Sequence, residues 1–236
     1  MSHSAKRSLL DELRAKSEAV RERDAAAHPP IEKLRQQIDG CLWRTFRWLE
    51  EAVGHLDVIR PTVARAFRLP DVLTLDRPQF DGGFVSYRRR GLGVQEEIDQ
   101  VELYYRLTGT EPFVLRVHPG AATVIAERLR TSTMPYELST EQDDRKVARS
   151  SVFRIQPSIA ATIRFAADYA QHAVDVTLSN VDRFESVRLQ FHPDAIDETA
   201  LEDLVRLMLG ESNGFLHRAP LALIRPSTGS GRTEAY

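Results

Sequence analysis

The sequence predicts an α+β protein in which an N-terminal helical arm or hairpin precedes a mainly antiparallel sheet domain with two helices. Three observations support this prediction. Apolar residues recur every three or four positions before residue 57, apolar and polar residues alternate after residue 83, and the links between the alternating runs are short. Because such links are too short for helical crossovers, we expect antiparallel pairing. The expected division is a helical arm at residues 1–60, an α+β sheet domain at 61–226 and a disordered tail at 227–236.

The strongest helical pattern runs from Ile31 to Leu56. A thinner, highly charged helix is expected from Ser4 to Ala27, and the two prolines that follow end it. The apolar stripe of the second helix is longer than this thin partner would cover, so we expect the stripe to be an interface. Its residues are Ile31, Leu34, Ile38, Leu42, Phe46, Leu49 and Val53.

Strands are predicted from period-two alternation, which sends successive side chains to opposite faces. The clearest run begins at Ile159 and places Ile163 and Phe165 on one face and Arg164 on the other. One face of the sheet should therefore pack on a core while the other stays polar. Further runs are expected at Phe84–Arg90, Asp99–Leu107, Phe113–Val117, Met134–Thr140, His172–Ser179 and Glu185–Phe191.

Two helices are expected within the sheet domain. One follows His118 and extends to about Arg130. The other follows the His-Pro pair at 192–193 and ends at Gly210, with candidate N-caps at Asp194, Asp197 and Thr199; the last would form a capping box with Glu202. A short helix is also expected in the proline-rich connector, from Pro61 to Phe67.

Composition excludes several classes of function. A net charge of −2 gives no overall attraction to nucleic acid or to an anionic membrane, and no apolar run reaches membrane-spanning length. The single cysteine, Cys41, allows no intrachain disulfide and lies on an apolar stripe, where a buried, inert thiol is expected. No secretory signal is recognised, so we expect a cytoplasmic protein. No metal-binding or cofactor motif is recognised either, so we expect neither a cofactor nor a metal.

Six arginines fall on or near the polar sides of the predicted strands. A cluster of them would bind phosphate or carboxylate groups, because the guanidinium is always charged and presents a bidentate fork. The alternative is a solvated face on which they pair with Glu102, Asp168 and Asp175, or a face partly covered by the N-terminal helices. The six are Arg89, Arg106, Arg116, Arg154, Arg164 and Arg188.

Short motifs add little. The run from Arg145 to Arg149 resembles the R-x-x-x-R half of the cyclic-di-GMP signature of PilZ domains, and Asp175–Asn180 resembles the other half. Thr177 and Asn180 depart from the residues of that pattern, and a helix stands where further strands should follow, so we assign no family. No catalytic motif is present and no catalytic residue is assigned.

The expected function is therefore that of a non-enzymatic cytoplasmic interaction protein, an adaptor or assembly subunit. It would dock a protein partner, or a second copy of itself, through the N-terminal helices. One alternative is a regulatory domain that binds a phosphorylated small molecule or nucleotide on the arginine-rich sheet face, and another is an enzyme without a recognisable motif.

The alternation makes a testable prediction for Arg164 and Arg188, which should both project from the polar face. Exposed ion pairs contribute about 0–1 kcal/mol, so Arg164→Ala and Arg188→Ala should each leave the melting temperature nearly unchanged in calorimetry. A large loss of stability from either substitution would show that the side chain belongs to a buried network.

Overall fold

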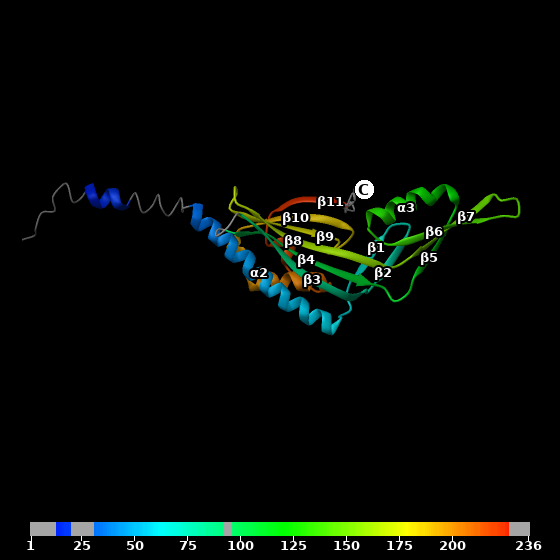
Figure 1. Cartoon of the computed structure of the whole chain (residues 1–236), viewed down its shortest axis with the longest axis horizontal. Helices are drawn as coiled ribbons and strands as arrows, with labels where there is room; N and C mark the ends of the chain where they lie inside the picture. The colour runs from blue at the N-terminus through cyan, green and yellow to red at the C-terminus, as the bar shows by residue number, and fades with distance from the viewer. Residues whose placement is uncertain (1–12, 20–30, 92–95, 227–236) are drawn as a thin grey trace, which may run out of the picture.

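The computed structural model describes residues 13–19, 31–91 and 96–226, and it confirms the α+β prediction (Figure 1). Its main element is a six-stranded, wholly antiparallel sheet with the order β11-β10-β9-β8-β4-β3. Neighbouring strands of this sheet are also consecutive along the chain, except that β8 pairs with β4 and the segment between these two strands lies outside the sheet. The strands are β3 (Gln79–Arg90), β4 (Glu97–Thr108), β8 (Ser158–Asp168), β9 (Ala173–Ser179), β10 (Glu185–Phe191) and β11 (Leu221–Pro226).

The alternation in β8 has the predicted consequence for burial. Ile159, Ile163 and Phe165 have no accessible surface, whereas Arg164, between the last two, is exposed. Helix α2 (Ile31–Ile59) packs against the apolar face of the sheet, and α4 (Glu198–Leu209) contributes to the same core. The hydrophobic core thus lies on one side of the sheet.

Helix α2 is held to the sheet at two points by its acidic side chains. The Asp39 carboxylate accepts a hydrogen bond from the Ile98 N–H of β4 at 2.7 Å, and Asp57 accepts one from the Gly83 N–H of β3 at 3.0 Å. Together with its buried stripe, these bonds make α2 part of the same core as the sheet. No described helix is long and apolar enough to span a membrane.

The first predicted helix and the predicted tail fall largely on residues that the structure does not describe. Residues 13–19 are helical, with exposed side chains, within the helix expected at Ser4–Ala27. The remainder of that helix and the tail at 227–236 lie outside the described residues.

A smaller, three-stranded antiparallel sheet lies between β4 and β8 in sequence and has the order β5-β7-β6. Its strands are β5 (Phe113–Val117), β6 (Tyr136–Gln142) and β7 (Ala148–Ile155), and helix α3 (Ala122–Thr131) accompanies them. Ile125 and Leu129 of α3 are buried, as is Phe153 of β7. In Figure 1 this part extends to the right of the main sheet. The Gly109 N–H donates to the Pro157 carbonyl at 2.7 Å, so the pairing of β4 with β8 continues toward the smaller sheet.

The prediction of a helix at Pro61–Phe67 is wrong. The chain instead forms a small hairpin of β1 (Ala66–Leu69) and β2 (Leu73–Asp76). Phe67 and Leu69 are buried, while Ala66 and Arg68 are exposed, which is the period of a strand. The proline that starts this segment suits a first helical turn, but the alternation that follows it favours a strand.

The two helices expected within the sheet domain are confirmed, with one change of cap. A 3₁₀ turn at Pro119–Ala121 precedes α3. The N-cap of α4 is Asp197, whose carboxylate accepts a hydrogen bond from the Ala200 N–H at 2.8 Å, so the capping box proposed at Thr199 is not the cap. Gly210 ends α4 in the left-handed region, at φ 73°, as expected.

Two glycines test this account with the same substitution. A Cβ at Gly210 would lie 2.9 Å from the Arg65 Cβ and 3.0 Å from the Ala64 carbonyl carbon, and an L-residue at positive φ costs about 1–2 kcal/mol. Gly210→Ala should therefore lower the free energy of unfolding by at least that amount in urea titrations. Gly54, within α2, has no neighbour within 4 Å of such a Cβ, so Gly54→Ala should raise it by about 1 kcal/mol. Equal effects from the two substitutions would contradict this account.

Candidate functional site

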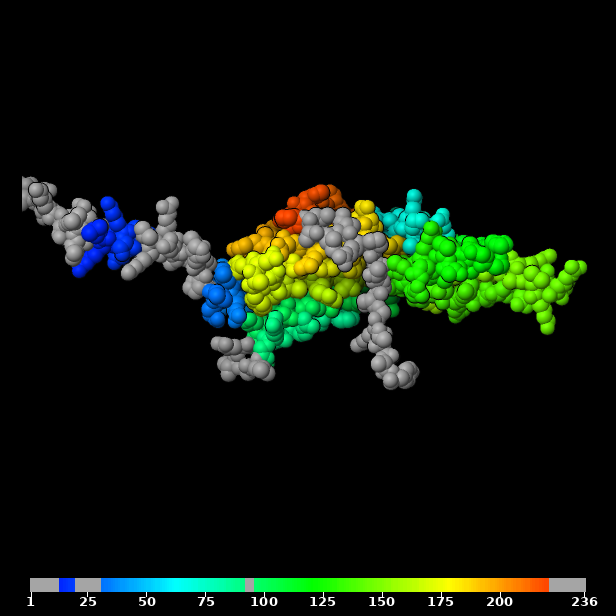
Figure 2. Space-filling model, turned by 90° about the horizontal axis from the view of Figure 1, so that it is seen from above, coloured from blue at the N-terminus to red at the C-terminus, as the bar shows by residue number. Residues whose placement is uncertain are grey.

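The face of the six-stranded sheet opposite α2 is polar, and Figure 2 looks onto it, with β3 and β4 at the lower rim. The register aligns Glu102 of β4, Arg164 of β8, Thr177 of β9 and Arg188 of β10 in one row across the sheet. Arg164 binds Glu102 at 3.1 Å, and Arg188 pairs with Asp175. The arginines on this face therefore lie beside acids, and α2 covers the opposite face.

The structure does not bring the six arginines together. Arg106, Arg164 and Arg188 lie on the open face, and Arg106 pairs with Asp81 at 3.1 Å. Arg116 and Arg154 belong to the smaller sheet, where Arg116 pairs with Glu141. The register of β3 shifts between Arg88 and Arg89, and this bulge places Arg89 opposite the buried Ile98. Arg89 also approaches Glu96 at 3.5 Å. Five of the six arginines, all except Arg154, therefore form separate ion pairs that are distributed over two sheets.

The residues expected at an interface are mostly occupied within the chain itself. Ile31 remains 72% exposed and Leu34 is partly buried. The rest of the stripe is buried in the shared core, namely Ile38, Leu42, Phe46, Leu49 and Val53. In this chain the apolar stripe of α2 therefore packs on its own sheet, and only the first turns leave apolar surface free.

The outer side of α2 has a surface that the sequence analysis overlooked. Both tryptophans of the chain, Trp43 and Trp48, line one shallow depression there, together with Arg44, Arg47 and two glutamates. Trp43 is 40% exposed. Their position beside the apolar stripe was visible in the sequence, but only the packing of the stripe shows that Trp43 faces outward.

Tyr87 of β3 extends this surface toward the edge of the sheet. Its ring lies edge-on to Trp43, with ring centroids 5.7 Å apart, and 4.7 Å from the buried ring of Phe46. The Arg89 guanidinium also lies over the Tyr87 ring, at 5.6 Å from its centroid. We call Trp43, Arg44, Arg47, Trp48 and Tyr87 the α2 patch.

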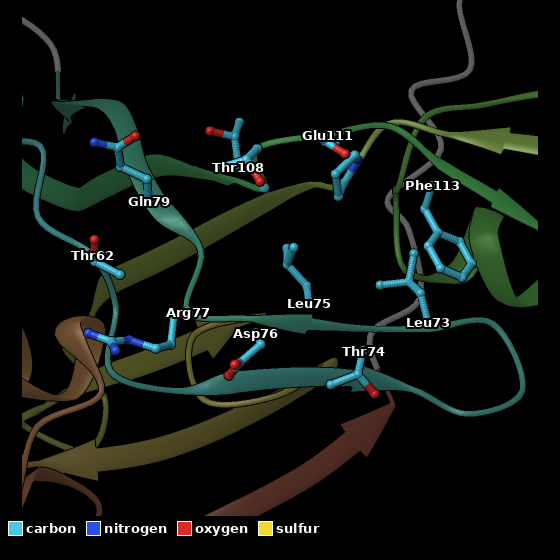
Figure 3. A pocket seen from close by; sticks show the side chains of 13 residues that line it. Thr62, Leu73, Thr74, Leu75, Asp76, Arg77, Gln79, Thr108, Glu111 and Phe113 are labelled. Atoms are coloured by element: carbon cyan, nitrogen blue, oxygen red, sulfur yellow. The ribbon is translucent and has the colours of Figure 1, made fainter.

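A cavity of about 320 Å³ lies where the hairpin β1–β2 meets the junction of the two sheets (Figure 3). Leu73 and Leu75 point into it from β2, and Phe113 closes one end. The polar side chains of Thr62, Gln79 and Thr108 lie along its border. The Gln79 amide already donates to the Arg60 carbonyl at 3.1 Å. This volume is at the lower limit of small-molecule sites.

The groups with strongly shifted pKa values do not converge on that cavity or on one another. Burial raises the pKa of the Cys41 thiol to about 11 and that of the Tyr169 phenol to about 12. The Tyr105 phenol, enclosed in the core, also has its pKa raised by burial. Active sites usually gather such groups in one cleft, whereas here they belong to α2, to the turn after β8 and to β4.

The remaining motifs also stay apart. The two halves that resemble the PilZ signature lie on different sheets, at the β6–β7 turn and on β9. Within the described residues, no group of three or more His, Cys, Asp or Glu side chains is placed to hold a metal ion. No family model matches the chain, and neither a curated protein nor a solved structure resembles it significantly.

Tyr105 gives a prediction for stability as a function of pH. Its hydroxyl is buried without a hydrogen-bond partner among the described residues, which costs about 1–3 kcal/mol. Tyr105→Phe should therefore leave the free energy of unfolding at neutral pH unchanged or raise it. Above about pH 10 the unfolded phenol ionises while the folded one keeps its proton, so the native chain should lose up to about 1.4 kcal/mol per pH unit.

The measurement is urea unfolding of both proteins from neutral to alkaline pH. Cys41 and Tyr169 titrate in both proteins, so the difference between the two curves isolates Tyr105. A variant that is clearly less stable at neutral pH would show that the hydroxyl makes a stabilising bond.

Proposed function

We propose that this protein is a non-enzymatic interaction protein, an adaptor or assembly subunit, that docks a protein partner on the α2 patch. The observation that supports this most directly is the position of both tryptophans on the outer side of α2. Tryptophan, tyrosine and arginine are the residues most enriched in binding hot spots, and two tryptophans, two arginines and a tyrosine meet here, beside Glu50 and Glu51. The interface predicted on the apolar stripe is thereby replaced by a surface beside that stripe, formed by residues of α2 and by Tyr87 of β3.

The energetic gain from docking is appreciable. The exposed 40% of Trp43 corresponds to roughly 100 Å², and its burial would contribute about 2.5 kcal/mol to association. The ring is already oriented by Phe46 and Tyr87, so little side-chain entropy would be lost on binding. The scattered positions of the groups with raised pKa values support a binding role over a catalytic one. We also propose a cytoplasmic location, with which the single buried thiol of Cys41 is compatible.

The test is photo-crosslinking in the cells that produce the protein. The photoreactive residue p-benzoylphenylalanine would replace Trp43 in one protein and Val124 in a control, because Val124 is an exposed apolar residue of α3, outside the α2 patch. We expect a discrete adduct at position 43, with another protein or a second copy of this chain, identified by mass spectrometry. No adduct at position 43, or the same adducts at both positions, would contradict the proposal.

A further inference from the structure

The outer side of β3 has unpaired main-chain groups beside the α2 patch. β3 is an edge strand of the six-stranded sheet, and within the sheet it pairs only with β4. The Gly83 N–H points outward, to Asp57, and alternate residues of an antiparallel strand point the same way. Val85 and Tyr87 therefore direct their N–H and C=O groups outward, and no described residue bonds to them there.

Only the second half of this edge is open. At the start of β3, Thr62 bridges to Gln79, and the Phe80 N–H donates to the Pro61 carbonyl at 2.9 Å. From Phe84 to Arg90 no described segment pairs with the outer side of β3. Such an edge is a template for another strand.

Aromatic side chains flank the open edge on both faces of the sheet. Tyr87 and Trp43 lie on the α2 side, and Phe84, which is 58% exposed, lies on the open side against Tyr104 at 5.4 Å. A strand added here would place alternate side chains against these two aromatic pairs. The edge is thus continuous with the α2 patch.

The charge at this edge favours an acidic occupant. Arg88, Arg89 and Arg90 are consecutive and exposed at the end of β3. Arg88 pairs with Asp99 and Arg89 approaches Glu96, whereas Arg90 has no carboxylate partner among the described residues. Antiparallel pairing of residues 84–90 with the β3 of a second copy would set Arg88, Arg89 and Arg90 opposite Ser86, Val85 and Phe84, so the facing strand would supply these arginines with no carboxylate.

We infer that the partner contributes an extended, acidic peptide segment that adds to the outer side of β3 as a seventh strand of the sheet. Its main chain bonds to Val85 and Tyr87, its alternate apolar side chains pack on Trp43 with Tyr87 and on Phe84, and its carboxylates pair with Arg89 and Arg90. This inference rests on the proposed docking at the α2 patch and specifies the chemistry of the partner.

The probe is a phage-displayed library of random 12-residue peptides, selected against the full chain. We expect enriched peptides with acidic residues, alternating apolar residues and no central proline. Synthetic copies should bind more weakly as salt is raised, since exposed charges are screened. They should also lose affinity with Trp43→Ala. A library that yields no enriched peptide, or only basic ones, would overturn the inference.

Strand addition is tested by methylating the peptide nitrogens one at a time. Only every second N–H of an added strand faces β3, so affinity should fall about tenfold at alternate positions and hold at those between. On the protein, Val85→Pro removes one outward N–H without removing a bond to β4, and it should weaken binding about tenfold. Val85→Ala keeps the N–H and is the matched control. The peptide scan remains decisive if Val85→Pro does not fold.

The outcomes separate the two proposals. If Trp43→Ala abolishes binding but N-methylation has no alternating effect, docking at the α2 patch stands and strand addition is overturned. If selected peptides bind the Trp43→Ala and Val85→Pro proteins as well as the native chain, neither surface is the site, and both proposals fail. A concentration-dependent dimer in light scattering that Val85→Pro dissociates would assign the edge to a second copy and overturn the peptide.

Discussion

The packing of α2 on the apolar face of the six-stranded sheet is the interaction on which the rest of the structure depends. Each large apolar side chain that it buries contributes about 1.5–3 kcal/mol, and Leu42, Leu49 and Ile38 have no accessible surface left. The carboxylates of Asp39 and Asp57 add hydrogen bonds to β4 and β3. A sheet with one apolar face needs such a cover, and the longest helix of the described chain provides it.

This packing also decides which surfaces remain for binding. Because the apolar stripe faces the sheet, the tryptophans beside it face outward, and Trp43 meets Tyr87 at the rim of β3. The opposite face of the sheet keeps its arginines beside acids, as in the pair of Arg164 with Glu102, so it presents alternating rather than single-sign charge. Of these surfaces, the edge at β3 combines exposed aromatic rings with unpaired main-chain groups.

The smaller sheet is coupled to the main one by close contacts at the junction rather than by a shared layer. A Cβ at Gly109 would lie 2.6 Å from the Leu75 side chain and 2.9 Å from Pro157, so this crossing point accepts only glycine without rearrangement. Arg128 of α3 donates to the Pro70 carbonyl at 2.9 Å and pairs with Asp71 in the β1–β2 turn. The hairpin β1–β2 thereby links both parts and borders the cavity between them.

The sequence by itself determined the elements whose pattern is local. Alternation placed Ile163 inside and Arg164 outside, and Gly210 ended its helix as expected, because side-chain period and the freedom of glycine act within a few residues. The hairpin β1–β2 escaped prediction because its strands are short and Pro61 suits a helix start equally well. Only the tertiary structure decided which partner covers the stripe of α2, since an apolar stripe specifies burial but not what buries it. The α2 patch and the open edge of β3 follow from that choice, as they are the surfaces left when the helix and the sheet have been paired.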